Sequence, residues 1–190
     1  FYKRRNGADD FKTYAKPIGN DKVLTLNNTN ASSTNSYWQN TDPSSTVLIV
    51  ADGGGFNTSG GTYVAYCFHS VQGYSKIGSY VGNGSNDGVF CYTGMKPSFV
   101  MIKRTDSTAS WLVFDNKRAN PFNEITADLR PDSSQAEDTD TSYNDLDFVS
   151  NGFKMRTSGA NPNVSGGSYI YMAFAESPLV GTNNIPATAR

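Results

Sequence analysis

Short apolar runs separated by polar, turn-rich stretches dominate the chain. The runs FVMIK at residues 99–103 and WLVF at residues 111–114 are bounded by turn residues and predict buried strands. The more polar residues 1–4 and 11–14 predict weaker versions of the same two strands. Further strands are predicted at residues 46–50, 63–69, 77–81, 88–92, 147–149, 153–156 and 169–175.

The connections between these runs are predicted to be turns and long loops. Asn151-Gly152 is a strong hairpin signal between two of the strands. The glycines at residues 53–55 and 60–61 predict turns, because a phosphate-binding loop would need a helix after it and a strand follows. Residues 29–40 and 132–144 are rich in Ser, Thr, Asn and Asp and predict loops, where variation and contacts concentrate.

The sequence contains an internal repeat. Residues 57–70 align with residues 163–176 at an offset of 106, and six of these fourteen positions are identical. Upstream, the Lys-Arg pair at residues 3–4 recurs at residues 103–104, an offset of 100. Loops of unequal length between shared strands explain the change of offset.

The repeat predicts an all-β chain of two tandem antiparallel β-sandwich units of about 100 residues each, the size of a small sandwich. We predict a truncated first unit at residues 1–72, a complete second unit at residues 73–178 and a C-terminal tail at residues 179–190. Residues 73–99 have no counterpart before residue 1, so the chain is expected to begin within a unit. The first unit should therefore have fewer strands and an open sheet edge, covered by upstream residues or by another subunit.

Composition narrows the classes of function. The net charge is −1 and 17% of the residues are charged, which gives no strong field for nucleic acid or an anionic membrane. No stretch approaches the roughly 20 apolar residues of a transmembrane helix. Cys67 and Cys91 lie in apolar strand-like runs, so we interpret them as small buried residues, with a disulfide as the alternative.

No catalytic, metal or cofactor site is predicted. His69 stands alone without a Gly-x-Ser-x-Gly motif and is interpreted as non-catalytic. The acidic residues of the second long loop and its flank are interpreted as a solvated loop face rather than a glycosidase pair or a calcium site. They are Glu137, Asp138, Asp140, Asp145 and Asp147. Tyr37 and Trp38 are weak candidates for ligand binding by stacking, with a loop anchor as the favoured alternative.

Several motifs together resemble a known family. They are GYSKIGSYVGNGS at residues 73–85, FVMIKRT at 99–105, WLVFD at 111–115, SNGFK at 150–154 and GSYIYMAFAE at 167–176. They are similar to a repeat domain found in tandem at the C-terminal end of marine phage and prophage tail-fibre-like virion proteins. The resemblance covers nearly all of the second unit and the latter half of the first, and residues 180–190 resemble the C-terminus of that family.

The resemblance implies a concanavalin-A-like sandwich and a non-enzymatic structural role on the tail or capsid exterior of a virion. Expected partners are other virion proteins and further copies of the chain, with a trimer as the guess, and a host surface glycan is a further possible partner. The alternatives are a capsid decoration or head-fibre protein, a polysaccharide-degrading domain and a carbohydrate-binding module. The family carries no established catalytic or binding residue to transfer.

Overall fold

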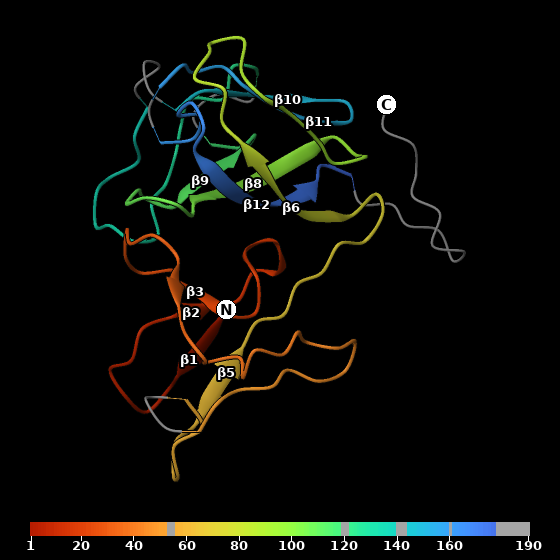
Figure 1. Cartoon of the computed structure of the whole chain (residues 1–190). Coiled ribbons are helices and arrows are strands. Elements are labelled where there is room, and N and C mark those ends of the chain that lie inside the picture. The colour runs from red at the N-terminus through yellow and green to blue at the C-terminus, as the bar shows by residue number, and fades with distance from the viewer. Residues whose placement is uncertain (53–55, 119–121, 140–143, 160, 178–190) are drawn as a thin grey trace.

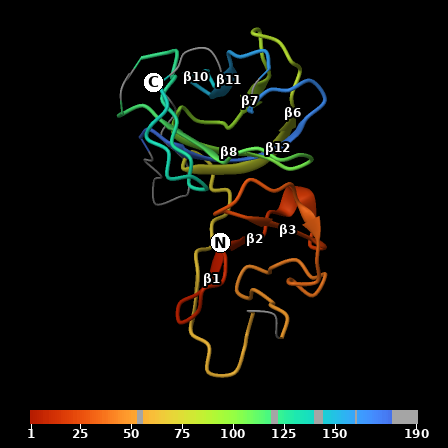
Figure 2. The same ribbon diagram turned by 90° about the vertical axis from the view of Figure 1, so that its left-hand side faces the viewer.

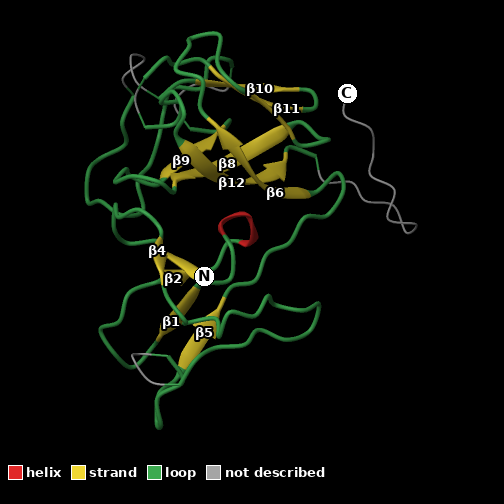
Figure 3. Ribbon diagram, viewed as in Figure 1, coloured by secondary structure: helices red, strands yellow, loops and turns green. Residues whose placement is uncertain are grey.

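The computed structural model describes residues 1–52, 56–118, 122–139, 144–159 and 161–177. Across these residues the chain forms twelve β-strands and one short 3-10 helix, η1 (Lys16–Ile18). The prediction of an all-β fold is confirmed (Figure 3). No helix in the described residues is long and apolar enough to cross a membrane. The predicted tail at residues 179–190 and the glycine turn at residues 53–55 lie outside the described residues.

The N-terminal part forms one antiparallel sheet with the strand order β4-β3-β2-β1-β5 (Figure 1). A cluster that includes Tyr2, Trp38 and Phe56 covers one face of this sheet. Four aromatic rings stack in the series Tyr63, Tyr2, Phe56 and Tyr37, with centroid separations of 5.3, 4.9 and 4.3 Å. The strands are β1 (Tyr2–Arg4), β2 (Lys12–Thr13), β3 (Lys22–Thr25), β4 (Ser33–Thr34) and β5 (Tyr63–Ala65).

The C-terminal part is a sandwich of two antiparallel sheets, with the orders β6-β12-β8-β9 and β10-β11-β7 (Figure 2). Alternating apolar side chains of both sheets fill the space between them, and Val100, Phe114, Leu146, Phe153 and Met155 have no exposed surface. The strands are β6 (Ser75–Val81), β7 (Phe90–Tyr92), β8 (Pro97–Arg104), β9 (Leu112–Asp115), β10 (Leu146–Val149), β11 (Gly152–Met155) and β12 (Ser168–Ala175).

The sequence repeat is also a repeat of strand register. Arg4 lies opposite Tyr63 where β1 pairs with β5, and Arg104 lies opposite Tyr169 where β8 pairs with β12. The hydrogen bonds repeat as well: the hydroxyl oxygen of Tyr63 accepts from the Thr58 amide at 2.8 Å, and that of Tyr169 accepts from the Val164 amide at 3.0 Å. Strands β1, β2 and β5 are therefore the counterparts of β8, β9 and β12.

The third and fourth strands of the first unit also have counterparts, reduced to single bridges. Asp128 bridges Asp138 ten residues later, as Val23 pairs with Ser33. The short strands β3 and β4 were not predicted, because two to four residues of mixed polarity carry no clear period. Their pairing partners define them instead.

Strands β6, β7, β10 and β11, which have no counterpart strand in the described N-terminal part, account for the difference between the units. Strands β6 and β7 fall within residues 73–99, the segment that lacks a counterpart, so the N-terminal part has five described strands and the C-terminal part seven. The predicted strand at residues 46–50 is wrong, since no strand forms there. Its counterpart β10 pairs with β11, which in turn pairs with β7. Without a β7 equivalent, residues 46–50 have no sheet to join.

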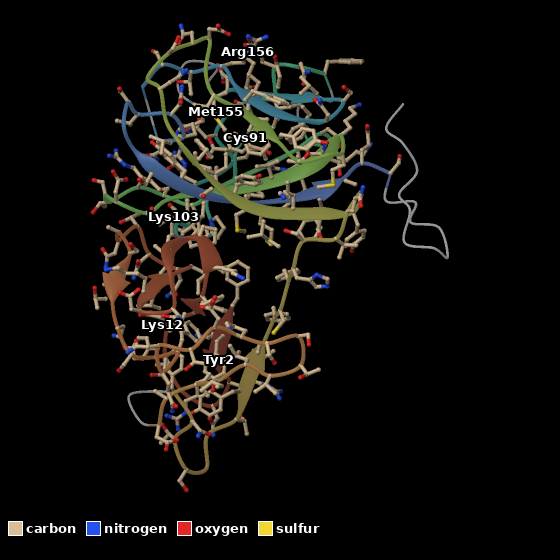
Figure 4. The ribbon with its side chains drawn as sticks, turned by 45° about the vertical axis from the view of Figure 1, so that its right-hand side comes forward. Tyr2, Lys12, Cys91, Lys103, Met155 and Arg156 are labelled. Carbon is tan, nitrogen blue, oxygen red and sulfur yellow. The ribbon has the colours of Figure 1, made fainter. Side chains whose placement is uncertain are left out.

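A buried contact joins the two parts. Ala15 and Leu24 of the first pack against Trp111 and Ile170 of the second. The Trp111 indole N–H donates to the carbonyl of Thr25 at 2.9 Å. Figure 4 shows Lys103 at this boundary. Its ammonium donates to the carbonyls of Thr29 at 3.1 Å and Ala109 at 2.7 Å, and the residue has no exposed surface.

Candidate functional site

Strand β7 presents two aromatic rings on the outside of the sandwich. Phe90 and Tyr92 are 45% and 64% exposed, whereas Cys91 between them faces the core and is 6% exposed. Alternate residues of a strand point to opposite faces, so the two rings share the outer face. The sheet that carries them lies at the end of the molecule away from the N-terminal part (Figure 2).

The neighbouring strand β11 packs closely against β7 and the Phe90 ring. Gly152 lies opposite Tyr92, and a Cβ at this glycine would stand 2.2 Å from the carbonyl oxygen of Cys91 and 2.9 Å from the Phe90 ring. A side chain therefore does not fit at residue 152. The Phe90 ring instead takes this space and lies against the backbone of the buried Gly152.

Ion pairs frame the open rings. Lys154 lies opposite Phe90 and forms an ion pair with Asp87. The hydrogen bond from the Lys154 ammonium lowers the pKa of Asp87. Next along the same face, Arg156 donates to Asp147 at 2.6 Å, and Figure 4 shows it on the outer side of the sandwich. We name this surface the β7 face; it consists of Phe90, Tyr92, Lys154, Arg156, Asp87 and Asp147. Aromatic faces beside charged hydrogen-bonding groups suit amphipathic ligands such as sugar rings.

The predicted ligand candidates Tyr37 and Trp38 lie elsewhere. Trp38 is only 1% exposed, and its indole N–H donates to the carbonyl of Lys22 at 3.0 Å. Its ring packs edge-on against Phe56 and Tyr14, while Tyr37 stacks on Phe56. Trp38 is thus a loop anchor in the core of the N-terminal part, with no ring face open to a ligand.

The two cysteines are both free, and they differ in burial. Cys91 is buried as predicted, and burial raises its pKa to about 12, which keeps the thiol protonated. The prediction of burial is wrong for Cys67, which is exposed on the segment after β5, and neither cysteine is in a disulfide. His69 is exposed on the same segment, where its Nδ1 lies 3.1 Å from the carbonyl oxygen of Ser70.

The acidic cluster is organised by arginines. Glu137 pairs with Arg118 and Asp138 with Arg130, each at 2.6 Å. Arg130 also holds Asp128, which is 1% exposed, and this bond raises the pKa of the guanidinium. Asp140 lies outside the described residues, and within the described part no group of three His, Cys, Asp or Glu could hold a metal ion.

A small pocket of about 190 Å³ opens on the sandwich of the C-terminal part. The amide of Asn123 bonds both the N–H and the carbonyl of Phe148, and the amide of Asn116 donates to Glu176 at 2.8 Å. None of the lining residues within the described part of the chain is a carboxylate. They are Lys96, Asn116, Phe122, Asn123, Ile125 and Phe148.

Sequence reasoning missed the β7 face. The alternation of Phe90, Cys91 and Tyr92 predicts a strand but does not say which side faces the core. In the structure Tyr92 lies opposite Gly152 on the outer face. The hairpin signal at Asn151-Gly152 did not indicate which strand would pair with Gly152.

The fold defines an all-β protein in which a single-sheet N-terminal part and a two-sheet C-terminal part share a strand register. The chain belongs to the family described as a domain of unknown function, DUF7483, whose match covers residues 1–178. No curated protein and no solved structure shows a significant match to the chain.

Proposed function

We propose that the chain is a non-enzymatic structural module of a phage virion, the C-terminal part of a tail fibre or a similar appendage. The observation that carries this proposal is the repeated unit with its shared strand register and buried junction. Stacked units that contact their neighbours build extended, stiff assemblies. The other subunits of the appendage, and further copies of the chain in a trimer, are the proposed partners.

The β7 face supports a second part of the proposal, that the module engages a host surface glycan. Phe90 and Tyr92 are exposed at the end of the molecule that is remote from the N-terminal part. The sheet that carries them fixes the spacing of the two rings. A shallow contact of this kind is weak alone. An appendage with several copies strengthens it through multivalency.

A polysaccharide-cleaving enzyme is the main alternative from another class. Such an enzyme needs two carboxylates about 5–10 Å apart, one of which keeps its proton as the general acid. Here Glu137, Asp138 and Asp147 each form an ion pair with an arginine, so each carboxylate already has a charged partner. The arrangement therefore favours the structural role, and a capsid decoration protein is the alternative within that class.

Immunogold electron microscopy tests the structural proposal. Antibodies raised against the chain should label an appendage on particles produced from the genome that encodes it. Gold at the tail supports the fibre, and gold over the head supports the capsid alternative. Particles without label, in a preparation where tail and capsid antibodies both work, would contradict the virion role.

Glycan binding has a separate test. The chain, fused to a trimeric coiled coil, is applied to an array of bacterial surface polysaccharides. The double variant F90A/Y92A should bind at least tenfold more weakly, while F122A, which removes an exposed ring outside the β7 face, should bind as the parent does. Equal loss in both variants would argue against the β7 face, and new reducing ends in the mixture would argue for an enzyme.

A further inference from the structure

The outer edge of β5 is open in the N-terminal sheet. Within the described residues, β5 pairs only with β1 and stands at the end of the strand order. In the C-terminal part the equivalent strand β12 is flanked on both sides, by β8 and by β6. The repeat therefore identifies what normally covers this edge, which is an antiparallel strand of the β6 type.

The backbone of β5 is oriented to receive such a strand. Phe1 and Tyr66 exchange two hydrogen bonds, and the amide of Arg5 donates to the carbonyl of Thr62 at 2.7 Å. Hydrogen-bonded pairs alternate in an antiparallel ladder. The backbone N–H and C=O groups of Val64 therefore also point to β1. The N–H and C=O groups of Tyr63 and Ala65 consequently point to the open side.

The segment after β5 is exposed at three successive residues. Tyr66 and Phe68 are 53% and 49% exposed, and Cys67 between them is exposed as well. At an offset of 106 their counterparts are residues 172–174 of β12, which lie opposite residues 77, 76 and 75 of β6. Strand β5 has three residues where β12 has eight, and in the described residues the segment after β5 forms no strand and has no neighbour of the β6 type.

We propose that the open edge of β5 is an acceptor site for a donor strand of the β6 type, supplied by a further unit of the same family in which that strand is not already paired. The donor runs antiparallel to β5 in the register that β6 keeps with β12. The donor residue equivalent to Tyr80 lies opposite Tyr63, and the one equivalent to Gly78 lies opposite Ala65. An exposed sheet edge that gains a strand forms main-chain hydrogen bonds along its length.

Exchange of β6 between two copies of this chain fits less well. Strand β6 is paired with β12 at seven positions, and all seven would have to break in the donor copy. The side-chain contacts of β6 would be lost too, including the stack of Tyr80 on Tyr169 at a centroid distance of 4.8 Å. A donor strand that is not already paired meets no such penalty.

A synthetic peptide of residues 72–83, added to the whole 190-residue chain, tests the proposal. We expect one peptide to bind per chain and to slow amide hydrogen exchange at Ala65 and Cys67, because both amides then donate to the peptide. A peptide carrying Gly78→Pro lacks one of the donors and should bind at least tenfold more weakly.

Two chain variants separate edge pairing from other modes of binding. Ala65→Pro removes an outward N–H without touching the bonds to β1, and should weaken peptide binding at least tenfold. Ala65→Ser changes the same exposed residue but keeps its N–H, and should bind like the parent. Circular dichroism confirms that both variants fold.

Three outcomes would overturn the proposal. One is no binding of the peptide, and another is equal binding to Ala65→Pro and Ala65→Ser. The third is slow exchange at Ala65 that depends on protein concentration without peptide. This last result would mean that a second copy of the chain covers the edge.

Discussion

Two lysines at equivalent positions of the repeat have different environments in the two parts of the chain. Lys3 and Lys103 occupy equivalent positions, and each donates to the carbonyl six residues later, Asp9 or Ala109. Lys3 remains partly exposed above the Phe11 ring, whereas the N-terminal part covers Lys103 completely. Burial lowers the pKa of Lys103 to about 8.

This lowered pKa predicts a pH dependence of stability. Between about pH 8 and about pH 10.5 the unfolded chain keeps a proton on Lys103 that the folded chain releases, so this residue makes unfolding less favourable as pH rises. Below pH 8 both states are charged, and the cost of burying the cation is fully present. That cost is at most about 3 kcal/mol, from the size of the pKa shift.

Comparison with Lys103→Met isolates this effect from other groups that titrate in the same range. The variant leaves two carbonyls without their donor and should lose about 1–3 kcal/mol at pH 7.5 in urea unfolding. Its deficit relative to the parent should grow between pH 8 and pH 10. A deficit that is constant over this range would show that the buried ammonium does not titrate there.

At the scale of the strands, close backbone approach decides where a side chain is tolerated. Gly82 follows β6, and a Cβ there would stand 2.2 Å from the carbonyl oxygen of Val164. The amide of Gly82 donates to the carbonyl of Gly167 at 2.8 Å, and the carbonyl of Gly82 accepts from the amide of Gly166 at 2.9 Å. Backbone atoms cannot yield as the end of a flexible side chain can.

Gly82→Ala should therefore destabilise the chain by about 1–3 kcal/mol in urea unfolding. Gly159→Ala is the matched control, since no atom lies within 4 Å of a Cβ at that position, and it should change stability by less than about 0.5 kcal/mol. If the two variants were equally stable, the pairing between residue 82 and residues 166–167 would not be as tight as described.

The sequence predicted the strands whose partners it also contains. The apolar runs that became β8, β9 and β12 have the length and period of core strands, and the two offsets located their counterparts β1, β2 and β5. The prediction of a strand at residues 46–50 was wrong. Their apolar pattern matches that of β10, but the described N-terminal part has no equivalent of β7 to complete the sheet. For Trp38 the sequence favoured a loop anchor but left ligand binding as a weak alternative, because burial by Phe56 and Tyr14 is a long-range effect.

At the scale of the whole molecule, the buried junction should make the two parts unfold together. The contact includes Leu24 and Trp111, 1% and 3% exposed, and the amide of Ser32 donates to the carbonyl of Thr105 at 2.9 Å. The incomplete N-terminal sheet depends on this contact, because it buries few side chains by itself.

Scanning calorimetry should therefore give one transition, with equal calorimetric and van't Hoff enthalpies. Two separated peaks would indicate that the N-terminal part is stable without its neighbour, and that the junction contributes little.

Amide hydrogen exchange of the chain alone tests the central claim, that two units of one strand register differ by an uncovered edge. Val64 and Ile170 are equivalent and both bond an inner strand, so both amides should exchange slowly. Ala65 and Tyr171 are also equivalent, but only Tyr171 has β6 beside it, so Ala65 should exchange fast and Tyr171 slowly. Slow exchange at Ala65, or fast exchange at Tyr171, would contradict the account.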